Sequence, residues 1–178
     1  MANTKGKGTY AIEVEPYELK NLLQLLSSLP KESQSIVRDK AQPLSKRLAG
    51  QLMMGALTAP SPQARLVMQS ITTPRDRLIR VDIGGSKKVG RKYGGTTSKN
   101  GKTRVKQSAA PAGALLWGTE YGSHSGVDSA SRKYTNRFKA PINKMGYWIA
   151  PAVDIYTPIV AKEYIAMVQG VINDLGFK

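Results

Sequence analysis

The sequence predicts an α+β fold, in which N-terminal helices and a C-terminal helix pack on a small, mainly antiparallel sheet. Apolar residues recur every three to four positions early in the chain and again near its end, as in helices with one buried face. Segments 9–15 and 78–83 alternate apolar and polar residues, which is typical of short strands. With 178 residues, 40% of them hydrophobic, the chain is expected to form a single domain, 1–178.

The first elements follow from this spacing. Residues 1–15 are expected to form an N-terminal arm that contains the first strand, and residues 16–29 a helix that ends before a proline. A longer helix is expected over about 31–59. Pro43 lies inside this helix and removes one backbone hydrogen bond, so the helix is expected either to kink or to break there. The apolar stripe keeps its phase across the proline, which favours a kink.

The remaining elements are placed by capping residues and prolines. Ser61 as N-cap and Pro62 at the first helical position predict a short helix that extends to Ile71. The last helix is expected over roughly 158–175, with Gly176 as its C-terminal stop. Two apolar segments, 109–121 and 145–153, are expected in the core, with a polar and then basic stretch between them.

The charge is concentrated in the middle of the chain. The protein has 27 Lys and Arg against 12 Asp and Glu, a net charge of +15. Residues 84–144 contain 13 basic and 2 acidic side chains, a net of +11, whereas residues 1–83 carry +5 and residues 145–178 carry −1. Such a surface suits a polyanion or another acidic partner. The longest apolar stretches are shorter than the ~20 residues of a membrane span, so no membrane partner is expected.

Residues 84–107 differ in kind from their surroundings. They contain eight Lys or Arg, six Gly and no acid, too little apolar surface to offset the entropy of ordering. We expect a mobile basic loop inserted in the domain, or a hairpin that orders only in an assembly. Eight residues are candidates for facing nucleic acid by non-specific phosphate contact: Lys87, Lys88, Arg91, Lys92, Lys99, Lys102, Arg104 and Lys106. A solvated loop without such a contact is an equally weighted alternative.

Composition and spacing argue against an enzyme. The chain has no Cys and one His, which excludes thiol chemistry and multi-histidine metal sites. Residues 95–103 resemble a P-loop but are one residue too long and lack the strand-to-helix context. Glu120, His124 and Asp128 would share one face of a helix, but the Gly and Ser residues between them disfavour that helix. We therefore expect no catalytic residues, no metal and no cofactor.

Several motifs in order resemble the neck and tail-completion proteins of long-tailed, siphovirus-type bacteriophages, which include tail-terminator-like, head–tail joining proteins. The resemblance covers residues 30 to 175, and its motifs are specific in combination. They are the proline-bearing helix with AQPL at 41–44, the helix-then-strand step over 65–84, the acidic–aromatic–Gly segment LLWGTEYGS at 115–123, and FKAP at 138–141 followed by GYWIAPAV at 146–153.

The resemblance implies a structural virion protein, made in the host cytoplasm, that assembles into a homo-oligomeric ring, six-fold in the family, at the head–tail junction. Its partners would be copies of itself, adjacent neck and tail-tube proteins, and the phage DNA in the lumen. It further implies a subunit interface, with Glu120 presented between glycines to a basic residue of the next subunit: Trp117, Glu120, Tyr121, Tyr147 and Trp148.

Two departures from the family pattern leave the exact neck component open. The basic segment 84–107 is longer than the expected loop, and residues 19–29 add a helix. Completion protein, terminator and stopper all remain candidates. Two other functions stay open beside this one. The first is a non-specific DNA- or RNA-binding accessory protein that uses residues 86–106, and the second, which is weaker, is a small hydrolase that uses His124.

Overall fold

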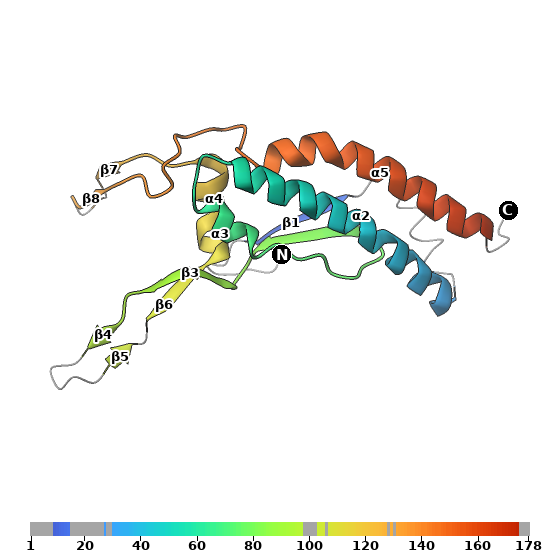
Figure 1. Ribbon diagram of the computed structural model, residues 1–178, viewed down its shortest axis with the longest axis horizontal. Helices are drawn as coiled ribbons and strands as arrows, with labels where there is room; N and C mark the ends of the chain where they lie inside the picture. Colours follow the sequence, from blue (N-terminus) through green and yellow to red (C-terminus); the bar gives the residue numbers. More distant parts are fainter. Residues whose placement is uncertain are drawn as a thin grey trace.

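Two long helices, α2 (Lys31–Thr58) and α5 (Ile149–Asp174), lie side by side and run in opposite directions (Figure 1). The computed structural model describes residues 9–14, 27, 30–97, 103–105, 107–127, 129 and 131–174. The two helices face each other with residues spaced at helical intervals, as the periodicity predicts: Val37, Ala41, Leu48, Leu52 and Ala56 on α2, and Val160, Tyr164, Val168 and Val171 on α5, all buried.

A two-stranded antiparallel sheet lies against these helices. Strand β1 (Thr9–Val14) pairs with β2 (Ile79–Gly84), in a register that places Thr9 opposite Gly84 and Val14 opposite Ile79. The alternate β2 residues Ile79, Val81 and Ile83 are buried in the same core as α2 and α5. The predicted α+β class is therefore confirmed, and both predicted strands are present within a residue or two of their expected limits.

Two short helices close one end of this core. Helix α3 (Ala64–Met68) packs against α4 (Ala112–Tyr121), which covers the apolar segment predicted at 109–121. The prediction of Ser61 as N-cap is wrong, because α3 begins at Ala64 and Gln63 holds the N-cap position. The Ser61 hydroxyl instead donates a hydrogen bond to Gln63 Oε1 at 3.0 Å.

A narrow antiparallel ribbon leaves the body at this end (Figure 1). Its base is β3 (Lys88–Tyr93) paired with β6 (Ser108–Pro111), and it continues outward as β4 (Thr96–Thr97) paired with β5 (Thr103–Val105). We call residues 88–111 the basic hairpin. Of the two forms expected for this segment, loop or hairpin, the structure has the hairpin.

A second extension follows α4 and leaves the same end of the long axis (Figure 1). It contains the short strands β7 (Gly126–Val127) and β8 (Lys133–Tyr134), which pair with each other. We call residues 123–145 the β7–β8 projection. It contains the polar and basic stretch that the sequence placed between two core segments.

Each long helix contains a proline, with a different outcome for its expected limits. Helix α2 runs unbroken through Pro43, so the break is excluded. Pro43 is exposed, and water can therefore satisfy the Asp39 carbonyl that lacks its helical partner. Helix α5 begins at Ile149, nine residues before the expected start, and contains Pro158 in its interior.

The expected helix over 16–29 lies, apart from Ser27, outside the described residues, as do residues 1–8 of the N-terminal arm. Within the described ranges, none of the helices combines the length and the apolar character that crossing a bilayer demands.

Candidate functional site

The base of the basic hairpin is anchored on the body. Val89 is buried, and Gly90, at φ +75°, lies so close to Leu66 of α3 that a Cβ there would be 2.9 Å from Leu66 Cδ1. Backbone hydrogen bonds from Ala112 N to Lys87 O (2.8 Å) and from Gly113 N to Gly85 O (2.9 Å) join the hairpin to the start of α4. The ribbon is thus held at its root while the rest of it extends from the core.

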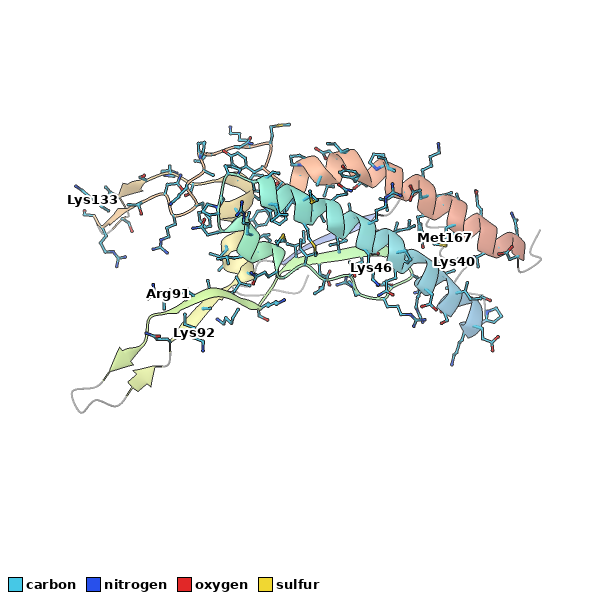
Figure 2. The ribbon with its side chains drawn as sticks, viewed as in Figure 1. Lys40, Lys46, Arg91, Lys92, Lys133 and Met167 are labelled. Carbon is cyan, nitrogen blue, oxygen red and sulfur yellow. The ribbon has the colours of Figure 1, made fainter. Side chains whose placement is uncertain are left out.

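The basic side chains of the hairpin are exposed where the structure describes them. Lys88, Arg91 and Lys92 are all exposed, and Figure 2 shows Arg91 and Lys92 on β3, outside the helical body. Lys87 is also exposed, but its ammonium donates a hydrogen bond to the Gln69 carbonyl, which ties it to the root. The other four candidates give no side-chain geometry, since Lys99, Lys102 and Lys106 lie outside the described residues and only the backbone of Arg104, in β5, lies within them.

The hairpin cations differ from those of the body in their surroundings. On the body, Arg47 pairs with Glu163 at 2.7 Å and Arg75 with Asp39 at 2.7 Å. The hydrogen bond from Arg75 holds the pKa of the Asp39 carboxyl below its usual value. Residues 84–107 contain no acid, so the hairpin offers no such partner within its own length. Its charge remains available to a polyanion.

Glu120 lies at the junction of α4 and α5 and is 2% exposed. Its carboxylate accepts three backbone hydrogen bonds from the first turn of α5: Oε2 from Trp148 N (3.2 Å) and Ile149 N (2.8 Å), and Oε1 from Ala150 N (2.8 Å). The first N–H groups of a helix have no partner within the helix and carry partial positive charge. Glu120 therefore caps α5 from a different helix.

Glu120 and Trp148, expected at a subunit interface, are not exposed for such a contact in this structure, because both side chains belong to the interior of the chain. The Glu120 carboxylate accepts its three hydrogen bonds from within its own chain. Trp148 is 1% exposed and packs in the core beside Gly55 of α2. Gly146, at φ +78°, makes the turn possible, since a Cβ there would be 2.1 Å from Glu120 Oε1.

The remaining interface candidates lie at the surface of the same junction. Trp117 is 51% exposed, and its ring stacks on Tyr121 with centroids 5.7 Å apart and planes at 17°. Tyr121 and Tyr147 are half-buried, and the Tyr147 hydroxyl donates to the Pro141 carbonyl at 2.9 Å. An exposed stacked pair of large aromatics is the kind of surface that anchors protein interfaces.

The structure does not assemble the candidate catalytic residues. Glu120 is buried on α4, whereas His124 is exposed in the segment that follows the end of that helix, and Asp128 lies outside the described residues. The common helical face considered for these three residues is therefore not formed. Among the described residues, no group of three or more His, Asp or Glu side chains comes close enough together to hold a metal ion.

Sequence reasoning missed the second group of exposed cations. These residues lie on the β7–β8 projection or at its root: Arg132, Lys133, Arg137, Lys139 and Lys144, all exposed. The charge count over 84–144 included them, but the hairpin alone was singled out because its composition is more extreme.

Comparisons with protein-family models, curated proteins and solved structures gave no match for this chain.

Proposed function

We propose that this chain is a structural protein of the bacteriophage head–tail junction, a neck, tail-completion or tail-terminator component that assembles into a ring around the DNA channel. The observation that supports this most directly is the basic hairpin, whose described cations Lys88, Arg91 and Lys92 are exposed on a ribbon outside the core. The order of motifs that resembles the neck and tail-completion family adds to this support.

The described surface suits assembly better than catalysis. An enzyme pocket excludes water and converges a few polar groups on one point. Two grooves among the described residues are instead open, one of about 250 Å³ beside Ser123 and Arg137 and one of about 310 Å³ lined by Lys46, Met53 and Ile71 among others. Large exposed apolar side chains are spread over α2, α4 and α5, and Trp117 with Tyr121 forms an aromatic pair suited to a subunit contact.

In a ring, each subunit uses two different faces, because the contacts are head-to-tail. The Trp117–Tyr121 pair would occupy one face, and the basic hairpin would extend into the lumen. Contacts there must be independent of DNA sequence, which phosphate contacts from Lys and Arg provide. Adjacent neck and tail-tube proteins would bind above and below such a ring.

The decisive experiment is immunogold electron microscopy of phage particles whose genome encodes the chain. Antibodies against the purified protein are expected to label the head–tail junction, with no label on head or tail tip. Particles without label would contradict a virion role.

Light scattering with the purified full-length protein tests self-assembly separately. A ring-sized species is expected to grow with concentration and to shift toward monomer in Trp117→Ala. The control Ile36→Ala removes a similarly exposed apolar side chain from the first part of α2 and should keep the wild-type mass. Equal masses for both variants would contradict the Trp117 contact.

A non-specific DNA- or RNA-binding accessory protein is the second candidate, and the exposed hairpin cations favour it equally. It predicts binding to nucleic acid by the monomer and no label on particles. The two functions are thus separated by the same microscopy.

A further inference from the structure

Resting on the proposed function, we propose that the β7–β8 projection is a second binding site for the phosphates of duplex DNA, separate from the basic hairpin. It has five exposed basic residues against one acid, Asp128, in its sequence over 123–145. Figure 2 shows Lys133 on this projection, at the end of the molecule from which the hairpin with Arg91 and Lys92 also extends. The cations therefore lie on two separate extensions of one end.

The roots of the two extensions are separated by a distance close to the width of a DNA groove. The hairpin ends at Pro111 and the projection starts at Ser123, so the ten-residue helix α4 separates their roots by about 15 Å, at 1.5 Å per residue. The major groove of B-DNA is about 12 Å wide, so the phosphate rows on its two sides are similarly spaced. At their roots, the two extensions are therefore far enough apart for each to approach a different side of one groove.

The root of the projection is rigidly built around Asn136. Its Nδ2 donates to the carbonyls of Ser123 (2.6 Å) and Ala140 (2.8 Å), and its Oδ1 accepts from Phe138 N (3.1 Å) and from Ser123 Oγ (2.7 Å). The Phe138 ring lies over Gly118 of α4, where a Cβ would be 2.1 Å from it. These contacts join the backbone around Asn136, from which the neighbouring cations extend, to the end of α4.

A groove at this root has the donors that a phosphate requires. Ser123, His124, Thr135, Arg137 and Phe138 line an open groove of about 250 Å³. The Ser123 hydroxyl already donates to Asn136, so the groups offered to a phosphate are the Arg137 guanidinium and the Thr135 hydroxyl. Both are usual partners of phosphate oxygens, and an arginine can bind two of those oxygens at once. The groove is open enough for a phosphate that remains part of a polymer.

Lys139 supports the same assignment. Its φ of 56° lies in the left-handed region, which favours glycine over a long side chain. The chain nevertheless has a lysine here, and its side chain is exposed. The left-handed backbone position thus carries an exposed cation two residues after Arg137.

Duplex DNA explains these observations better than an acidic protein does. The charges are divided between two extensions, and a polymer with regularly repeated phosphates can occupy both at once. Among the described residues of the hairpin, Tyr93 is the one aromatic side chain, so stacking of unpaired bases on the hairpin has little support.

The test compares three charge-removing variants of the full-length protein. The projection variant is Lys133→Gln with Arg137→Gln and Lys139→Gln, and the hairpin variant is Lys88→Gln with Arg91→Gln and Lys92→Gln. The control variant is Lys31→Gln with Lys46→Gln and Lys162→Gln, which removes three exposed charges from α2 and α5. Binding to a short fluorescein-labelled DNA duplex is measured by anisotropy over a range of salt concentrations, after circular dichroism has shown that each variant is folded.

The projection and hairpin variants are each expected to lower the slope of log affinity against log salt by about 2 to 3, because each neutralised phosphate accounts for ~0.9 of that slope, while the control keeps the wild-type slope. Lys133→Arg with Arg137→Lys should also keep it, because it retains the charges. If the hairpin variant weakens binding and the projection variant behaves as the control, this inference is overturned and the proposed function is not.

Two further outcomes would also overturn the inference. The first is that a polyglutamate peptide binds as tightly as the duplex and that the projection variant loses affinity for the peptide to the same extent. The projection would then be a surface for acidic chains in general. No binding of duplex by the wild type at low salt would remove the DNA contact of the proposed function as well.

Discussion

Glu120 is the residue whose role changes most between sequence and structure. In the sequence it stands next to Tyr121 and Gly122, as an acid in a turn would. In the structure its carboxylate is enclosed and accepts N–H groups 28 to 30 residues further along the chain. A buried charge is costly unless it is fully hydrogen-bonded. The three donors of α5 make this burial favourable.

Replacing Glu120 by Ala should lower the free energy of unfolding by about 3 kcal/mol, because three N–H groups at the start of α5 lose their acceptor. Urea denaturation measures this decrease. The control is Glu163→Ala, which removes a carboxylate that is 37% exposed and pairs with Arg47, and it should cost less than about 1 kcal/mol. Equal decreases in the two variants would show that the cap contributes no more than a surface ion pair.

Tyr164 gives the fold a dependence on alkaline pH. It lies on α5 and is fully buried, its hydroxyl donates to the Arg77 carbonyl, and burial raises its pKa to about 12 from an ordinary 10.0. The unfolded chain thus ionises at lower pH than the fold does. The stabilisation from the neutral hydroxyl is complete below pH 10 and is lost as pH rises from 10 to about 12.

Wild type and Tyr164→Phe should therefore differ in their pH profiles. The variant loses the hydrogen bond to Arg77, a cost of about 1 kcal/mol at neutral pH. Above pH 10 the wild type should lose stability faster than the variant, so the difference between them shrinks. Urea denaturation at several pH values between about 8 and 11.5 measures this, and parallel profiles would mean that Tyr164 ionises normally in the fold.

At the scale of elements, the end of α4 decides where the β7–β8 projection lies. Gly122 follows α4 with φ +74°, and its N–H closes the helix on the Gly118 carbonyl at 3.1 Å. A Cβ at Gly122 would be 1.8 Å from the Pro141 carbonyl oxygen. Only glycine satisfies both the backbone conformation and the close approach.

Gly122→Ala should therefore destabilise the protein by more than about 2 kcal/mol. The matched control has the opposite sign: Gly50 lies inside α2 with nothing within 4 Å of its Cβ position, so Gly50→Ala should stabilise by about 1 kcal/mol. Thermal unfolding of both variants measures the two effects. A neutral Gly122→Ala would mean that the end of α4 can rearrange without cost.

The observed limits of the helices show which local sequence signals are enough to predict where a helix begins and ends. The apolar stripe predicted α2 almost to the residue, because this helix is long and has one consistently buried face. Helix α5 was expected to start at Pro158, since proline favours a first turn. It starts at Ile149 because Glu120, remote in sequence, caps it there. A cap that comes from a residue so far away in the sequence cannot be predicted from the residues around Ile149.

At the scale of the whole molecule, the outer half of the basic hairpin is separable from the core. The buried cluster is formed mainly by α2, α3, α4, α5 and β2, and no residue of β4 or β5 belongs to it as far as the structure describes them. The outer ribbon should then contribute charge without contributing to the stability of the body.

Replacing residues 94–107 by Asn-Gly joins Tyr93 to Ser108, which already pair, through a two-residue turn. The variant should unfold at the wild-type temperature, yet its affinity for duplex should depend less on salt, by about 3 to 4 in slope, since four Lys and Arg residues are removed. Calorimetry and fluorescence anisotropy check the two parts. A large drop in unfolding temperature would show that the outer ribbon supports the core. An unchanged slope of log affinity against log salt would show that the outer ribbon does not contact DNA.

Composition and periodicity alone were enough to predict the α+β class, the long helix α2, strand β2 and the cationic middle of the chain, because each follows from neighbouring residues. For the candidate site, the sequence predicted only part. The charge of the hairpin could be predicted from composition. The burial of Glu120 and Trp148 could not, and neither could the common end of the molecule from which the two basic extensions leave. Those features depend on contacts between segments far apart in sequence. Packing of α4 against the start of α5 encloses Glu120, and α4 sets the spacing between the two extensions.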